Sequence, residues 1–205
     1  MRVRADIPAA PWHSAVDALL WVHAATPAAR DALPQSLDAR AGLAITIGGL
    51  IHYSDGPVGR YDEIFGAPLV LRAVPPLSHV AFMAVDSQLS VTGGRQNWAL
   101  PKVPATFEGR AGWPGTVTAG GDGWELSVTA TARARRFPFR AAFRCAQVWP
   151  DQTTREFTVR MRGRARVGGV ELTHRTRSPL ADWLVEGHHQ AILLHGTQDV
   201  SAARG

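Results

Sequence analysis

The chain contains a single lysine, Lys102, among its 22 lysine and arginine residues. Arginine serves as well as lysine for solubility and for most surface ion pairs, and it makes better bidentate contacts. An arginine side chain cannot lose its proton near neutral pH, however, so it cannot attack a carbonyl group as an amine. A bias toward arginine codons explains the ratio, but the one lysine that remains indicates amine chemistry at position 102.

The neighbours of this lysine are unusual for a surface position. Trp98, Leu100 and Val103 are apolar, and Pro101 and Pro104 stiffen the backbone on either side. Burial lowers the pKa of a lysine because the ammonium loses its hydration. We therefore expect a neutral amine that forms an imine with a ketone; the protonated imine can accept the electron pair left when CO2 departs from a β-keto acid. The alternative interpretation is a stem that packs on Trp98 while the ammonium reaches water.

Three segments resemble the acetoacetate decarboxylase-like superfamily. The segment GRQNWALPK (residues 94–102) is similar to the family signature G-R-E-x-x-x-x-P-K, and it ends on the sole lysine. Upstream, Gly59-Arg60-Tyr61-Asp62-Glu63 is similar to the family's Gly-x-Tyr-x-Glu segment. Near the C-terminus, Pro179-Leu180-Ala181 is similar to the turn before the family's last strand. The likeness spans most of the chain, and the lysine segment is its specific part.

The resemblance implies a role for each matched residue. Lys102 matches the lysine that forms the Schiff base, and Glu63 matches the pocket glutamate that positions substrate or handles protons. Arg95 matches the signature arginine, which would support the lysine segment or bind a carboxylate. The expected catalytic residues are thus Lys102 and Glu63, and the expected substrate-binding residues are Arg95, Gln96, Tyr61 and Trp98.

Two positions depart from the family pattern. Val103 stands where the decarboxylase has a second lysine, and Gln96 stands where the signature has a glutamate. An arginine, or apolar burial alone, must then lower the pKa of Lys102. The family's N-terminal pocket arginine matches no residue of this chain. Superfamily members with similar departures include enzymes that use the same imine for aldol condensation or dehydration.

The leading hypothesis is a Schiff-base lyase, an acetoacetate decarboxylase-like carboxy-lyase, that acts on a small keto acid without a metal or an organic cofactor. Two alternatives stay open. One is an aldolase or dehydratase that uses the imine on Lys102, and the other is a barrel that binds a small molecule without catalysis. The resemblance also implies a homo-oligomer.

The elements that must position these residues are mostly strands. Alternating apolar and polar residues predict a hairpin of 116–118 and 124–135, and a strand over 157–167 with arginines on its outer face. Gly168-Gly169 is typical of a hairpin turn, which would set Arg166 opposite Glu171. Gly93-Gly94 also reads as a turn. Further strands are predicted at 42–53, 64–74, 79–85 and 137–148, and short helices at 26–33 and 87–97, while 17–25 fits either a helix or a strand.

Length and composition set the remaining limits. The 205 residues, 45% of them hydrophobic and 19% charged, predict one globular domain spanning 1–205. Antiparallel strands in this number imply a sandwich or a closed barrel. The resemblance selects the second, so the expected fold class is mainly β (α+β), a single-domain antiparallel β-barrel with few short helices.

Composition also excludes several classes of partner. The net charge of +5 suggests nucleic acid, but the arginines alternate along a strand without interleaved aromatic residues, so no nucleic-acid partner is expected. No apolar run approaches the ~20 residues that span a bilayer, so no membrane partner is expected. The single Cys145 excludes an internal disulfide, no apolar stretch of a secretory signal follows Met1, and a cytoplasmic location is expected.

Overall fold

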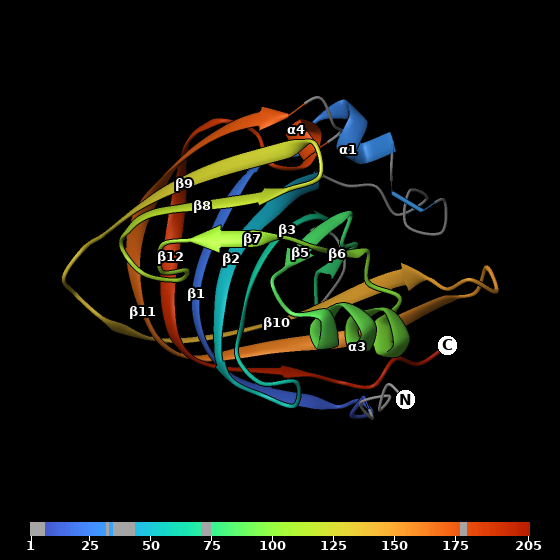
Figure 1. Cartoon of the computed structure of the whole chain (residues 1–205). Coiled ribbons are helices and arrows are strands. Elements are labelled where there is room, and N and C mark those ends of the chain that lie inside the picture. The colour runs from blue at the N-terminus through green and yellow to red at the C-terminus, as the bar shows by residue number, and fades with distance from the viewer. Residues whose placement is uncertain (1–6, 32, 35–43, 71–74, 177–179) are drawn as a thin grey trace, which may run out of the picture.

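The computed structural model describes residues 7–31, 33–34, 44–70, 75–176 and 180–205, and strands dominate them (Figure 1). The strands are β1 (Trp12–Ala24), β2 (Ala44–Asp55), β3 (Tyr61–Val70), β4 (Leu77–Ser78), β5 (Phe82–Val85), β6 (Lys102–Pro104), β7 (Thr106–Glu108), β8 (Gly115–Gly121), β9 (Trp124–Ala132), β10 (Phe137–Val148), β11 (Thr154–Thr176) and β12 (Gly187–Val200). The helices are α1 (Pro27–Asp31), α3 (Gln88–Trp98) and α4 (Leu180–Trp183).

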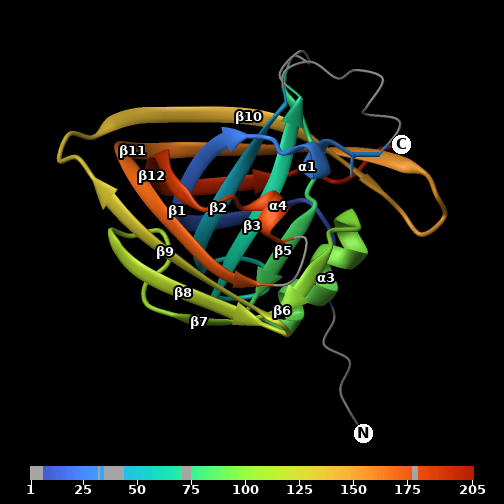
Figure 2. The ribbon, with the colours of Figure 1, turned by 90° about the horizontal axis from the view of Figure 1, so that it is seen from above.

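The strands form a closed ring. Strands β10, β4, β3, β2, β1, β12 and β11 are successive neighbours, and the pairing of β10 with β11 completes the circle. The long strand β11 pairs with β10 along its first part and with β9 along its second, while β12 runs beside both parts. Strands β7, β8 and β9 therefore extend the sheet beyond the ring, as the view from above shows (Figure 2). The mainly β, antiparallel fold with few short helices is confirmed.

Strand β1 is buried on both faces, which explains why its sequence fits either a helix or a strand. Val16 and Ala18 belong to the core inside the ring, whereas Leu19 and Trp21 belong to a second core that β8 and β9 cover. A strand that is apolar on both sides loses the alternation by which a strand is usually found. Local sequence therefore left 17–25 undecided.

The hairpin predicted at Gly168-Gly169 is wrong. Both glycines lie inside β11, and Arg166 pairs with Leu193 of β12 instead of facing Glu171. A side chain at Gly168 would collide with the backbone oxygen of Thr131 on β9. Glycine is therefore needed here because β11 and β9 approach closely, and not because the chain turns. The arginine alternation upstream of this point is confirmed, because the buried positions 157, 159, 161 and 165 alternate with exposed arginines at 160, 162 and 164.

The predicted turn at Gly93-Gly94 is also wrong, because both residues lie inside α3. This helix begins after its N-cap Ser87, whose hydroxyl accepts a hydrogen bond from the Ser90 amide at 3.2 Å. A side chain at Gly93 would meet the indole of Trp12 at 2.5 Å, so the helix packs closely on the barrel at this turn. The helix therefore lies against one end of the ring, beside β5 and β6 (Figure 1).

Several predicted boundaries move by a few residues. Helix α1 begins after Thr26, as predicted, but ends at Asp31 instead of Leu33. The predicted strand 79–85 is β5 alone, since β4 ends at Ser78. Residues 42–43 and 71–74 of the predicted strands, together with Met1 and Pro179, lie outside the described residues. In the described part of the chain, no helix has the length and apolar character that crossing a membrane requires.

Candidate active site

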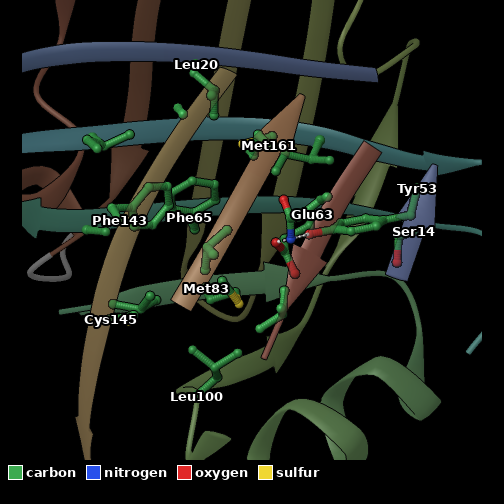
Figure 3. A pocket seen from close by; sticks show the side chains of 18 of the residues that line it. Ser14, Leu20, Tyr53, Glu63, Phe65, Met83, Leu100, Phe143, Cys145 and Met161 are labelled. Atoms are coloured by element: carbon green, nitrogen blue, oxygen red, sulfur yellow. Dashed lines mark hydrogen bonds between the residues drawn. The ribbon is translucent and has the colours of Figure 1, made fainter. Parts of the chain in front are cut away.

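A cavity of about 450 Å³ fills the interior of the ring (Figure 3). Strands β1, β2, β3, β5, β10, β11 and β12 contribute its walls, and α3 and β6 close one end with Trp98 and Lys102. Its walls are mainly apolar and rich in aromatic rings, which include Trp12, Phe65, Phe139, Phe143 and Phe157. Pockets of this kind, with a few convergent polar groups, are typical of small-molecule sites.

Lys102 is the first residue of β6, and its side chain enters this cavity. The residue is only 3% exposed. Its Nζ donates hydrogen bonds to Oε2 of Glu63 at 2.7 Å and to Oγ of Ser90 at 2.8 Å. Sequence reasoning left two placements open, a buried amine and an ammonium in water, and the structure shows the buried amine. The burial of the residue therefore agrees with the leading hypothesis.

Glu63 projects from β3 toward the same point and is also 3% exposed. Its Oε1 accepts a hydrogen bond from the Tyr53 hydroxyl at 3.0 Å, and Gln198 donates to that hydroxyl oxygen at 3.0 Å. The adjacent Asp62 pairs with His52 on the opposite side of the strand. Each oxygen of the buried carboxylate thus has a partner, which is the condition under which a buried ion pair is tolerated.

Two stacked tyrosine rings lie beside the ion pair of Lys102 and Glu63. The rings of Tyr53 and Tyr61 stack with their centroids 4.2 Å apart, and Nζ of Lys102 lies 5.2 Å from the centroid of the Tyr61 ring. A cation at this distance from an aromatic face is attracted by the ring electrons. Tyr61 therefore lines the cavity beside Nζ of Lys102.

Helix α3 holds the stem of Lys102 in place. A β-carbon at Gly94 would lie 2.6 Å from Cδ and 2.7 Å from Cε of Lys102, so the stem occupies the space that this glycine leaves. Ser90, one turn earlier on the same helix, supplies the hydroxyl that accepts from Nζ. The helix therefore positions Lys102 in two ways: Gly94 leaves room for its stem, and Ser90 accepts a hydrogen bond from its Nζ.

The substrate-binding roles expected for Arg95 and Gln96 do not fit their positions. Arg95 donates from Nε at 2.9 Å and from its terminal nitrogen at 2.6 Å to the backbone oxygen of Lys102, and it does not line the cavity. Gln96 is exposed on α3 and does not line the cavity either. The two hydrogen bonds of Arg95 tie α3 to the backbone of Lys102, which is the contact that support of the lysine segment requires.

Trp98 lines the cavity, as its expected role requires. Its indole nitrogen donates to the backbone oxygen of Ser201 at 2.7 Å, and its ring makes an edge-to-face contact with Trp12 at 4.9 Å. The indole is therefore fixed by the C-terminal segment, and only its apolar surface is available to a ligand. Of the six residues named from the sequence, Lys102, Glu63, Tyr61 and Trp98 meet at the cavity.

The prediction that Lys102 has a lowered pKa is wrong for the protein without substrate. Burial by itself lowers the pKa of the amine, but the carboxylate of Glu63 and the phenol of Tyr61 favour the ammonium and raise its pKa above the ordinary value. No arginine takes the place of a second lysine among the described residues that line the cavity. The resting state is therefore an ion pair, and a neutral amine requires transfer of the proton to a partner.

Comparison with solved structures shows the fold, although no protein-family model matches the chain and no curated protein has a similar sequence. An acetoacetate decarboxylase structure matches with a TM-score of 0.64 at 14% identity, over 96% of this chain and 91% of that one. Acetoacetate decarboxylase from Legionella pneumophila matches with a TM-score of 0.59 at 12% identity, over 97% and 88%. The chain has the acetoacetate decarboxylase-like fold.

A third structure with the acetoacetate decarboxylase-like fold extends the comparison. It is the enduracididine biosynthesis enzyme MppR, in complex with the condensation product of pyruvate and imidazole 4-carboxaldehyde. MppR matches this chain with a TM-score of 0.61 at 16% identity, over 98% of this chain and 91% of that one. The likeness therefore covers nearly the whole chain and is not limited to the lysine segment.

Sequence reasoning missed three residues of the hydrogen-bonded site. Ser90, Tyr53 and Gln198 come from α3, β2 and β12, and each is joined to the ion pair directly or through one hydroxyl. Only Ser90 could have been suspected from the sequence, because it lies twelve residues before Lys102 on a segment that was predicted as a helix beside the lysine. Tyr53 and Gln198 had no such signal, since only the closure of the ring brings their strands to Glu63.

Two other titratable side chains of the cavity, Cys145 and Tyr53, hold their protons at neutral pH. Burial raises the pKa of the Cys145 thiol to about 11, so this cavity residue is a thiol and not a thiolate nucleophile at neutral pH. Burial and the nearby Glu63 carboxylate raise the pKa of Tyr53 well above its ordinary value. No cluster of histidine, cysteine, aspartate and glutamate side chains suited to a metal ion occurs in the described ranges.

The raised pKa of Cys145 predicts a loss of stability in alkali. The unfolded thiol releases its proton near its ordinary value of 9.0, whereas the folded thiol keeps it to about 11. Between those values the folded state binds more protons, so the free energy of unfolding falls as pH rises, by about 1.4 kcal/mol per pH unit. Urea unfolding measured from pH 8 to pH 10 tests this. Cys145→Ala should reduce the slope, and an unchanged slope would refute the assignment.

Proposed function

We propose that this protein is a Schiff-base lyase in which Lys102 attacks the carbonyl carbon of a small molecule bound in the cavity. The observation that carries the proposal is a buried lysine amine 2.7 Å from a buried carboxylate, at the wall of an apolar cavity. A structural ion pair has no need of a cavity, and burying charges away from water is costly. A titratable group whose pKa is perturbed by burial and a charged partner in a pocket is typical of a functional site.

Glu63 can convert the resting ammonium into a nucleophile. Transfer of one proton from Nζ to Oε2 along the 2.7 Å hydrogen bond gives a neutral amine and a neutral carboxylic acid. An apolar substrate that covers the site excludes water and penalises the separated charges, so the neutral pair becomes more accessible. Glu63 thereby acts as a general base over the distance that general acid–base catalysis requires.

Lys102 and Glu63 can then carry out all the proton transfers of imine formation. The lone pair of Nζ bonds to the carbonyl carbon, and the carbonyl oxygen takes up a proton from the acid form of Glu63. The Glu63 carboxylate then takes a second proton from nitrogen and passes it to the same oxygen. That oxygen leaves as water, and Lys102 is left as a protonated imine. Two protons of the original ammonium leave with the water, the third stays on nitrogen, and the positive charge is conserved.

For a β-keto acid, the protonated imine withdraws the electron pair of the breaking carbon–carbon bond. CO2 leaves, an enamine forms, and a proton delivered to its carbon followed by hydrolysis releases the ketone and restores Lys102. The apolar cavity supports this step because it weakens the hydration of the carboxylate that is lost. Acetoacetate-like decarboxylation is therefore the first reaction that we assign to the site.

Aldol condensation or dehydration through the same imine is the second candidate. The cavity of about 450 Å³ has room for a second carbonyl compound beside the imine. MppR, which shares the fold, has been solved with the product of a condensation between pyruvate and an aldehyde. An enamine on Lys102 that attacks an aldehyde instead of taking a proton would give this outcome.

Borohydride trapping tests the proposed function. We expect sodium borohydride with acetoacetate, pyruvate or a ketone to reduce the imine and leave a stable mass increase on the chain. Because Lys102 is the sole lysine, peptide mapping has only to separate it from the N-terminal amine. Release of CO2 from β-keto acids then separates decarboxylation from condensation. Absence of an adduct with every carbonyl compound would overturn the proposal and favour a binding protein without catalysis.

A further inference from the structure

The cavity carries no charged side chain other than the ion pair, among the described residues that line it. Lys102 and Glu63 neutralise each other at 2.7 Å, and burial keeps the thiol of Cys145 protonated. No arginine of β11 lines the cavity, and Arg160, Arg162 and Arg164 are exposed to solvent. The protonated imine on Lys102 can pair with one carboxylate of a ligand, so a second carboxylate would be buried without a partner, which is strongly unfavourable.

The cavity is also much larger than a small keto acid. Its volume is about 450 Å³. Pockets for drug-sized ligands range from about 300 to 1,000 Å³. A molecule as small as acetoacetate would leave most of the apolar wall uncovered, so small substrates alone do not account for the size of this cavity.

The wall continues away from Lys102 as an apolar surface. Strand β10 contributes Phe139, Ala141 and Phe143, and β11 contributes Met161. Figure 3 shows Phe143, Phe65 and Leu20 on the side of the cavity away from Tyr53 and Ser14, with the Glu63 carboxylate between the two groups. The site therefore combines one reactive polar end with a long apolar part.

The cavity reaches the surface between apolar side chains. Val22 of β1 and Val167 of β11 line it and are 45% and 41% exposed. Their strands flank β12, whose Ile192 pairs with both Leu20 and Val167. Large apolar side chains exposed at the rim of a pocket are typical of a ligand-binding opening. An apolar ligand can thus enter without crossing a charged rim at this point.

We propose that the cavity selects a carbonyl compound with a large alkyl or aryl substituent, whose carbonyl carbon reaches Lys102 while the substituent fills the apolar part. This inference rests on the proposed function for the carbonyl group only, because the binding of the substituent does not depend on imine formation. The substrate is a ketone, an aldehyde or a β-keto acid with a single acidic group, and the substituent supplies most of the binding free energy.

A series of straight-chain methyl ketones, from propanone to nonanone, tests the selection. We expect the dissociation constant measured by calorimetry to tighten about fourfold for each added methylene until the cavity is filled. The matching secondary alcohols cannot form an imine and should show the same trend. Pyruvate and acetoacetate should bind more weakly than the longest ketones.

Two variants of β10 provide the matched control. Ala141 lines the cavity, whereas the adjacent Ala142 is exposed on the other face of the same strand. Ala141→Phe fills the apolar part and should weaken binding of nonanone at least tenfold more than it lowers the trapping of pyruvate. Ala142→Phe adds the same ring outside the cavity and should change neither measurement.

The outcomes separate this inference from the proposed function. Chain-length dependence in the alcohols without any borohydride adduct would support the apolar site and refute the Schiff base. Adducts that form equally well with pyruvate and with nonanone, together with alcohol binding that is independent of chain length, would overturn the inference and leave the Schiff base intact. An equal effect of both phenylalanine variants would likewise contradict the assigned cavity wall.

Discussion

Replacing Lys102 with methionine should abolish imine formation and reduce turnover of any carbonyl substrate on the order of a thousandfold or more. Methionine fills a similar volume but has no amine, so no covalent intermediate can form. The measurement is borohydride trapping followed by mass spectrometry, together with product formation at saturating substrate. An adduct that persists on the methionine variant would place the reaction elsewhere, at the N-terminal amine or in solution.

A control is needed because this variant leaves the Glu63 carboxylate buried without its partner. Removing one member of a buried pair costs about 3–5 kcal/mol of stability. The double variant Lys102→Met with Glu63→Gln removes both charges, so it should recover much of that loss while still forming no adduct. Circular dichroism and urea unfolding of the single and double variants separate a missing nucleophile from a protein that fails to fold.

Glu63→Gln should slow turnover by about 10²–10⁴-fold, the range for loss of a general acid–base group. The variant retains the amine, so borohydride should still trap an adduct. Glutamine also removes the anion that raises the pKa of Lys102, while the burial that lowers this pKa remains. Adduct formation should therefore extend to lower pH than in the unaltered protein, although later proton transfers are slow.

Measuring the rate of trapping from pH 5 to pH 9 tests that shift. A profile identical to that of the unaltered protein would show that Glu63 does not control the protonation of Lys102. Tyr53→Phe is the matched comparison, because it removes one hydrogen bond to the carboxylate and leaves the ion pair in place. It should move the profile less than Glu63→Gln does.

The parts of the site that sequence reasoning found are those with a local signal. Lys102 stood out by residue type, the strand predicted at 137–148 is β10, and the strand predicted from alternation at 157–167 lies within the longer β11. The closed ring agreed with the resemblance. In each case, the informative residues are neighbours in the sequence, or their hydrophobicity repeats with the period of a single helix or strand.

The parts that were wrong depend on contacts between distant segments. Glycine pairs at 93–94 and 168–169 look like turns, yet each permits close approach of Trp12, Lys102 or β9 from elsewhere in the chain. The pKa of Lys102 was predicted from its apolar neighbours alone, whereas its direction is decided by a carboxylate on another strand. Such pairings follow from the closed ring and cannot be obtained from local periodicity.

The space at Gly94 has a further consequence for rate. A free lysine side chain loses about 2 kcal/mol of rotamer entropy when it is confined to one conformation. Here the stem lies against the helix backbone, and the nitrogen is held by Ser90 and Glu63. That freedom is lost when the chain folds, so in the proposed reaction the amine would meet its substrate already oriented, and the barrier to bond formation would carry little cost for ordering the nucleophile.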